Sequence, residues 1–183
     1  MKSKEIKNTY VMPLLVLTVI CLIVSAALAY MNMQTSPIIA AAAEERTEAA
    51  MSLKMPDATG FENINPDYIE GALPSSIKEI YRATNGIGYI FIAGVNGFSG
   101  EIRIICAVDP SGKIVAVSTL SHTETKGIGT IIEQDSFLSP FSGKDSNLDG
   151  IDTVSGATIT TRAFIGAIED VLKAYDLVNS QVN

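Results

Sequence analysis

A run of hydroxyl side chains around one glycine, DTVSGAT at residues 152–158, is the stretch best suited to chemistry. Ile159, Thr160 and Thr161 follow it and lead into a helix-like pattern. Unpaired N–H groups and the helix dipole favour a phosphate at such a helix start, and Gly156 would let the backbone approach it closely. The same residues could instead be ordinary N-caps, which composition alone favours because serine and threonine are preferred there.

A second stretch, SHTETKGIG at residues 121–129, puts the only histidine and a glutamate before two glycines at the end of a predicted strand. It fits either a glycine turn with His122 and Glu124 on the surface, or a loop that contacts a bound cofactor. With one histidine and two separated cysteines, Cys21 and Cys106, the chain has no ligand set for zinc or an iron–sulfur cluster. We therefore expect no metal, and any redox chemistry must come from an organic cofactor.

Together the two stretches resemble a known family. Asp-x-x-Ser-Gly-Ala-Thr is similar to the flavinylation motif of the FMN-binding domain found in the G subunit of the Rnf electron-transport complex and in the C subunit of the Na⁺-translocating NADH:quinone reductase. Residues 121–129 resemble that family's His-x-Glu-Thr-Pro-Gly-Leu-Gly loop, with Lys126 in place of the proline. Two motifs in the family order are more specific than either alone, and the resemblance covers roughly residues 72–178.

The resemblance implies a covalent cofactor. In this family a flavin transferase moves FMN from FAD onto the last residue of the motif, which is Thr158 here, through a phosphoester. The protein positions the flavin and supplies no general acid, base or nucleophile of its own, so we predict no catalytic residues. A lysine near a phosphate or a reduced flavin would be electrostatically favourable. The other predicted cofactor contacts are Asp152, Ser155, Gly156, Ala157, Glu124, Thr125, Lys126, Gly127 and Ile128.

An uncharged apolar run covers residues 10–30, and its 21 positions exceed the roughly 20 that a helix needs to cross a hydrocarbon core. Three lysines and a single glutamate precede it, whereas the next basic residue after it is Arg46. By the positive-inside rule, the N-terminus is cytoplasmic and everything after Met31 lies outside the cell membrane.

A cleaved signal peptide and a lipid-modified cysteine are less favoured origins of this run. Ala27-Leu28-Ala29 resembles the cleavage site of a signal peptide, but the run is longer than the roughly 7–15 residues of an h-region. Lipid attachment at Cys21 would normally need a small residue before it, where this chain has Ile20. A disulfide from Cys21 to Cys106 would join the membrane to the exported domain, so we expect none. The sequence thus predicts a retained single-pass anchor in contact with membrane lipid.

Hydrophobic periods and turn residues define the remaining elements. The predicted elements are a helix at 37–55, a loop at 56–74, strands at 77–83, 87–93, 102–108 and 114–120, a short helix at 127–134, an irregular stretch at 137–150 and a helix from about 160 to 177. In the last helix one apolar face is expected, made of Phe164, Ile168, Val171, Leu172 and Tyr175. The strands form an antiparallel meander, so the fold class is α+β, with helices against one side of the sheet.

The predicted organisation is a cytoplasmic N-terminus at 1–9, a transmembrane helix at 10–31, a helical linker and wrapping loop at 32–71, the covalent FMN-binding domain at 72–178 and a tail at 179–183. The part after Met31 has 10 basic and 19 acidic residues, a formal charge of −9, which disfavours nucleic acid as a partner.

The predicted function follows from the resemblance. The chain would be the electron-carrying flavoprotein subunit of an Rnf-type complex, which couples ferredoxin oxidation and NAD⁺ reduction to Na⁺ or H⁺ export. Its partners would be the other membrane subunits and, during maturation, the flavin transferase. Two alternatives remain: a stand-alone membrane-anchored extracytoplasmic flavin reductase, and an anchored binding or sensor module with no covalent cofactor.

Overall fold

The structure, a computed structural model, describes residues 11–64 and 73–182. The predicted cytoplasmic segment 1–9 lies outside the described residues, and so do Tyr10, residues 65–72 and Asn183. The chain divides into two units, residues 1–45 and 46–183.

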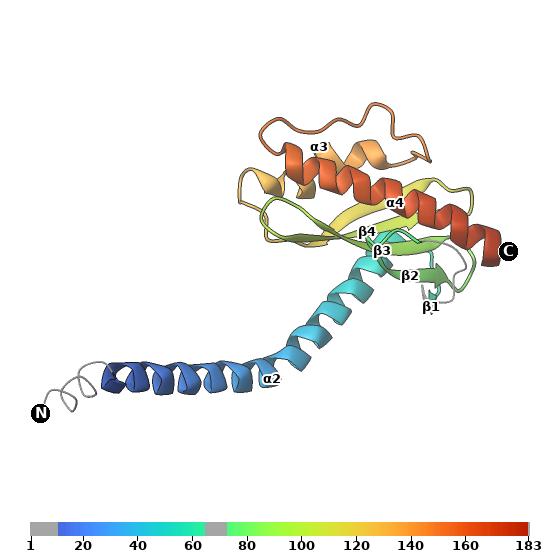
Figure 1. Cartoon of the computed structure of the whole chain (residues 1–183). Coiled ribbons are helices and arrows are strands. Elements are labelled where there is room, and N and C mark those ends of the chain that lie inside the picture. The colour runs from blue at the N-terminus through green and yellow to red at the C-terminus, as the bar shows by residue number, and fades with distance from the viewer. Residues whose placement is uncertain (1–10, 65–72, 183) are drawn as a thin grey trace, which may run out of the picture. The chain divides into compact units, whose positions relative to one another are not determined.

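The first unit consists of the greater part of helix α2 (Met12–Lys54), in blue in Figure 1. Within the described ranges it is the one helix long and apolar enough to cross a membrane, and none of its most apolar window is buried. This agrees with the predicted N-terminal transmembrane helix. The helix predicted at 37–55 is not separate, because α2 continues through Pro37 and ends at Lys54, before Pro56.

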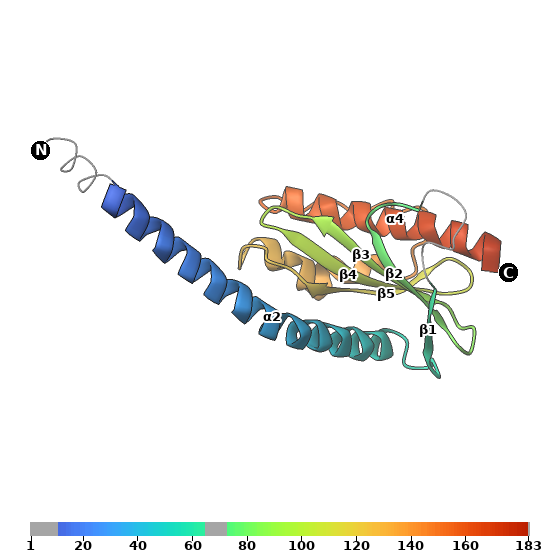
Figure 2. The same ribbon diagram turned by 60° about the horizontal axis from the view of Figure 1, so that its bottom comes forward.

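The second unit is built on an antiparallel sheet with strand order β1-β2-β3-β4-β5, so neighbours in sequence are neighbours in space (Figure 2). Its strands are β1 (Phe61–Ile64), β2 (Ile77–Ala83), β3 (Tyr89–Asn96), β4 (Glu101–Val108) and β5 (Ile114–Ser121). The predicted α+β class and the meander are confirmed. Neighbouring antiparallel strands need only short turns between them. The turn between β3 and β4 forms part of the candidate functional site described below.

Strand β1 lies inside the stretch that was predicted as a loop, and that part of the prediction was wrong. It pairs with β2 through Phe61 opposite Ala83, and Phe61 packs against the apolar cluster on one face of the sheet. A strand of four residues is too short to show an alternating pattern in the sequence. Strand β3 also starts at Tyr89 instead of Ile87 and runs on to Asn96.

Helix α4 (Thr158–Val182) lies across one face of the sheet, as Figures 1 and 2 both show. All five residues of its predicted apolar face are buried, and they join side chains of β2, β3 and β4 in the main core. The helix is longer than predicted, because it starts at Thr158 and continues to Val182, past the expected end near Leu177. The first turn of this packed helix belongs to the candidate site.

The opposite face of the sheet carries a second, smaller core. Ile90, Ile105 and Ala107 are completely buried there, and Met51 and Met55 cover them from the end of α2 and the residue after it. Both faces of the sheet are therefore covered by apolar side chains. Cys106 points into the main core, where burial raises the pKa of its thiol to about 12, and both Cys21 and Cys106 are free thiols.

Three short helical segments connect β5 to the loop before α4: η3 (Gly129–Glu133), α3 (Asp135–Leu138) and η4 (Ser139–Phe141). The predicted short helix at 127–134 is thus a 3₁₀ helix, and the stretch predicted as irregular starts with α3 and η4. Phe137 and Phe141 hold these segments against α4, since their ring centroids lie 5.3 and 5.7 Å from that of Phe164. Such aromatic pairs add to the stabilisation from burial.

The turn between β4 and β5 depends on a carboxylate. One oxygen of Asp109 accepts hydrogen bonds from the Ser111 hydroxyl (2.6 Å) and from the backbone N–H groups of Ser111 (2.8 Å) and Lys113 (3.0 Å). Burial alone would raise the pKa of Asp109, but these hydrogen bonds and the charge of Lys113 together lower it. The ionised form is therefore the one that stabilises the turn.

We expect Asp109→Asn to lower the free energy of unfolding at neutral pH by about 1.5–3 kcal/mol, the range for hydrogen bonds to a charged group. Because the folded pKa of Asp109 lies below its unfolded value, this stabilisation is present above the unfolded pKa and is lost as pH falls through the folded pKa. Denaturant unfolding of both proteins over an acidic pH series would measure this. If the difference in unfolding free energy between the two proteins stayed constant down to the lowest pH, the stabilising role of the ionised Asp109 carboxylate would be contradicted.

Candidate functional site

The loop before α4 is a tight turn built around Gly156. This glycine has a φ of +86°, in the left-handed region that side chains rarely adopt. The Ala157 N–H donates to the Val154 carbonyl at 3.0 Å, and α4 begins one residue later, at Thr158. The first N–H groups of a helix have no partner within the helix. The N-terminus of α4, directly after this turn, therefore carries a partial positive charge that attracts anions.

Thr161 fixes this turn to the helix. Its hydroxyl accepts a hydrogen bond from the Val154 N–H at 3.1 Å and donates one to the Ala157 carbonyl at 3.0 Å. The side chain is completely buried. One hydroxyl therefore closes the loop on both sides of Gly156, a role that the sequence does not distinguish from ordinary capping.

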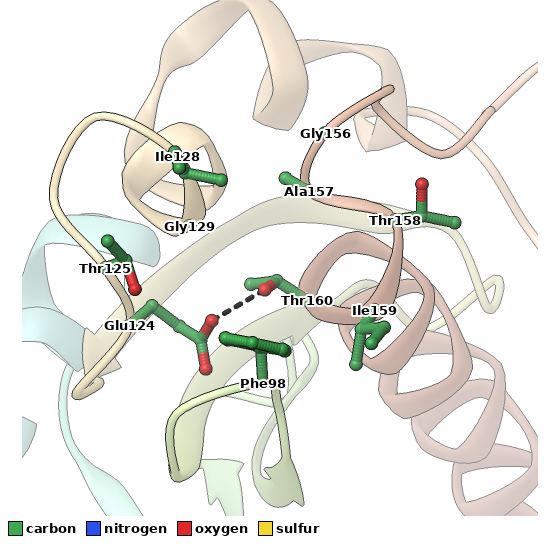
Figure 3. A pocket seen from close by; sticks show the side chains of 10 residues that line it. All are labelled: Phe98, Glu124, Thr125, Ile128, Gly129, Gly156, Ala157, Thr158, Ile159 and Thr160. Carbon is green, nitrogen blue, oxygen red and sulfur yellow. Dashed lines mark hydrogen bonds between the residues drawn. The ribbon is translucent and has the colours of Figure 1, made fainter.

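Thr158 is half-buried, and its hydroxyl makes only a long hydrogen bond, 3.4 Å, to the Val154 carbonyl. Figure 3 shows this hydroxyl pointing away from the hydrogen bond between Glu124 and Thr160. A weakly bonded hydroxyl on a side chain that is not fully buried is a candidate for modification. The fold keeps its position fixed, because the residues on both sides of Thr158 belong to the turn and the helix.

Glu124, from the loop after β5, lies opposite the start of α4. Its carboxylate accepts a hydrogen bond from the Ser99 N–H at 2.9 Å and one from the Thr160 hydroxyl at 2.6 Å. The residue is 7% exposed. Burial raises the pKa of Glu124, but the hydrogen bonds from Thr160, Ser99 and the Phe98 backbone, together with the electrostatic effect of His122, outweigh it and lower the pKa below its ordinary value. The side chain is therefore ionised, not exposed on the surface.

Two glycines leave the space that this carboxylate occupies. A Cβ at Gly97 would overlap Oε1 of Glu124, and a Cβ at Gly129 would lie 2.8 Å from Oε2. His122 fixes the backbone beside it, since its Nδ1 accepts the Glu124 N–H at 3.0 Å and its Nε2 lies 3.0 Å from Glu133.

These segments enclose a cavity of about 350 Å³ (Figure 3). Three large apolar side chains form its rim, with exposed fractions of 69% for Phe98, 53% for Ile128 and 58% for Ile159. The residues that line it are Phe98, Glu124, Thr125, Ile128, Gly129, Gly156, Ala157, Thr158, Ile159 and Thr160. An apolar cavity of this size beside a helix start suits a small ligand that has an aromatic ring and a phosphate.

The structure brings together six of the ten predicted contacts, and these six line the cavity: Glu124, Thr125, Ile128, Gly156, Ala157 and Thr158. Of the other four, Ser155, Lys126 and Gly127 are exposed, and Asp152 lines a different cavity of about 220 Å³. In the part of the chain that the structure describes, no group of three acidic, histidine or cysteine side chains could hold a metal ion.

Four residues that line the cavity were absent from the prediction: Phe98, Gly129, Ile159 and Thr160. The last three stand within or beside the two motifs, and their position next to the motif glycines could have indicated them. Phe98 follows Asn96-Gly97, an ordinary turn signal, and nothing in the sequence connects that turn to the other two segments.

Comparison with known proteins identifies the family. The sequence model of the FMN-binding domain matches residues 97–173. The chain is 29% identical to the G subunit of the proton-translocating ferredoxin:NAD(+) oxidoreductase complex of Clostridium ljungdahlii, over 86% of each chain. It is 30% identical to the G subunit of the ion-translocating oxidoreductase complex of Cereibacter sphaeroides, over 95% of this chain and 88% of that protein. This chain belongs to the G-subunit family of ion-translocating oxidoreductase complexes.

The FMN-binding region of this G-subunit relative contains every residue that lines the cavity, from Phe98 to Thr160. The crystal structure of Shewanella oneidensis NqrC has a similar fold, with a TM-score of 0.50 and 22% identity over 64% of this chain and 70% of that one. The predicted resemblance to the FMN-binding domain family is thus confirmed at the level of sequence family, and the α+β fold agrees with it.

We expect Thr161→Val to lower the free energy of unfolding by about 1–3 kcal/mol, because it leaves the half-buried Val154 N–H without its acceptor. Valine keeps the branched shape of threonine, so the loss of packing is small. Thr161→Ser is the matched control, since it keeps the hydroxyl and removes only a methyl group. Denaturant unfolding of the detergent-solubilised chain would compare the three proteins. Equal stability of the valine and serine variants would contradict the role assigned to the hydroxyl.

Proposed function

We propose that this G-subunit relative is a membrane-anchored flavoprotein that carries electrons within an Rnf-type complex, with FMN joined to Thr158 by a phosphoester. One observation carries the proposal: the cavity between Glu124 and the start of α4 contains Thr158 and lies wholly inside the FMN-binding region. The apolar rim suits a flavin ring, and the helix start suits its phosphate.

Each wall of the cavity has its own part in holding the cofactor. Gly156 and the first turn of α4 would hold the phosphate, while Phe98, Ile128 and Ile159 would contact the ring. Glu124 keeps the turn before β4 next to α4. When bound, the flavin supplies the capacity to accept and donate electrons, and the protein supplies its position and surroundings.

Attachment of the flavin requires a separate flavin transferase. The reaction breaks the pyrophosphate bond of FAD and forms a bond between the FMN phosphorus and the Thr158 oxygen, releasing AMP and the hydroxyl proton. The described site offers no base for this step, because the Thr158 hydroxyl contacts a backbone carbonyl. Such an enzyme needs to reach the weakly bonded hydroxyl of Thr158.

The proposed topology puts the N-terminus in the cytoplasm and the FMN domain, at residues 72–178, outside the cell membrane. The exposed apolar part of α2 supports membrane attachment, and the lysines at the N-terminus support the orientation. The partners would be membrane subunits that contain redox centres. The complex would couple ferredoxin oxidation and NAD⁺ reduction to Na⁺ or H⁺ export.

We expect the chain, co-expressed with a flavin transferase, to carry one FMN that stays attached under denaturing conditions. Thr158→Ala should lose the adduct completely, because it removes the acceptor oxygen, and Thr158→Ser should keep it. Thr153→Ala is the matched control, since it removes an exposed neighbouring hydroxyl at a variable position of the motif that does not line the cavity. Intact mass and in-gel flavin fluorescence measure the adduct. An adduct on the Thr158→Ala protein, or wild-type protein without flavin, would exclude the proposed linkage.

The proposed orientation is testable with two single-cysteine variants, made in a chain whose own Cys21 and Cys106 are replaced by alanine. Leu53 is 79% exposed near the end of α2, so Leu53→Cys should react with a membrane-impermeant maleimide added to intact spheroplasts. Lys4→Cys should react only after the membrane is permeabilised, because it is placed in the cytoplasm. Labelling of Lys4→Cys and not of Leu53→Cys in intact spheroplasts would reverse the topology.

A further inference from the structure

Glu124 is the only charged side chain among the ten residues that line the cavity. It is 7% exposed, and its partner Thr160 is 2% exposed. Its oxygens accept hydrogen bonds from a backbone N–H and a hydroxyl, and none of the ion pairs among the described residues includes it. The wall of the cavity therefore carries a negative charge that no ion pair in the described part of the chain neutralises.

The chain is shaped to keep this charge there. Gly97 and Gly129 approach the carboxylate from two sides, and a side chain at either position would displace it. Burial raises the pKa of Glu124, but the hydrogen bonds from Thr160, Ser99 and the Phe98 backbone and the electrostatic effect of nearby His122 lower it by more, so the carboxylate stays ionised at neutral pH. Hydrogen bonds to neutral donors stabilise a charge without cancelling its long-range field.

We propose that Glu124 lowers the reduction potential of the flavin held in this cavity. This inference rests on the proposed function. Electrons from a redox centre of a partner subunit add net negative charge to the ring whenever fewer protons than electrons are taken up. A fixed carboxylate in a wall of low dielectric disfavours that added charge much more than the same group would in water. Exposed Lys126 is screened by solvent and offsets this effect weakly.

A purely structural role of Glu124 is the competing hypothesis, because its hydrogen bonds also join the turn at Ser99 to α4. Two variants of nearly unchanged shape separate the two roles. Glu124→Gln removes the charge. Thr160→Val removes the hydroxyl that disperses the charge and so raises the pKa of Glu124, and all potentials are therefore compared at alkaline pH, where the carboxylate keeps its charge. Both disturb the same hydrogen bond between Oε2 and Oγ1. The electrostatic role predicts opposite shifts, and a structural role predicts shifts of the same sign or none.

The test is a spectroelectrochemical titration of the purified full-length proteins loaded with FMN, with loading checked by intact mass. We expect the midpoint potential to shift upward in Glu124→Gln and downward in Thr160→Val. Glu169→Gln is the matched control, since it makes the same chemical change on an exposed part of α4 beside a different cavity, and it should leave the potential unchanged.

The outcomes are distinct. Opposite shifts in the two variants would support the electrostatic role. An unchanged potential in Glu124→Gln, or shifts of one sign in both variants, would overturn it while leaving the flavin assignment intact. A shift in Glu169→Gln as large as that in Glu124→Gln would also overturn it, because the effect would then not depend on the cavity. Wild-type protein that carries no flavin would overturn this inference and the proposed function together.

Discussion

The candidate site depends on the buried carboxylate of Glu124, which needs hydrogen-bond donors in place of water. A charged group out of water is costly unless hydrogen bonds replace its hydration. Glu124 meets that requirement with donors from two segments distant in sequence, the Ser99 N–H in the turn before β4 and the Thr160 hydroxyl in the first turn of α4. The same bonds hold the three walls of the cavity together. Gly97 and Gly129 are needed for the same reason, because the carboxylate fills the space beside them.

The sheet and α4 make this meeting possible. The meander places the turn between β3 and β4 at one end of the sheet. Helix α4 lies across one face of the sheet, and its first turn is at that same end (Figures 1 and 2). Fully buried Phe164 and Ile168 anchor the helix, and burying such side chains contributes roughly 1.5–3 kcal/mol each. Phe137 and Phe141 then hold the segments after β5 against Phe164. The polar bonds of the site thus rest on an apolar frame that fixes the helix start.

Elements with a regular hydrophobic period were predictable from the sequence, whereas features that depend on contacts between residues far apart in the chain were missed. The apolar face of α4 and strands β2 to β5 were predictable because hydrophobic periods report burial directly. Strand β1 was not, because four residues show no period. Thr160 and Glu124 are 36 residues apart, so their bond depends on the whole fold. Phe98 is a solvent-exposed aromatic residue in a turn, and no local rule connects it to α4. The motifs located the cavity, but they also included Asp152 and Ser155, which do not line it.

The shape of the cavity gives a physical reason for a covalent link. Its three rim side chains are each more than half exposed, and a cavity of about 350 Å³ is near the lower limit for small-molecule sites. Such a site buries too little of a flavin to hold it tightly by contact alone. A bond to Thr158 would make binding intramolecular, so the local concentration of the ring would stay high without strong contacts. The cavity could then remain open, and an open cavity would leave an edge of the proposed flavin exposed to a redox partner.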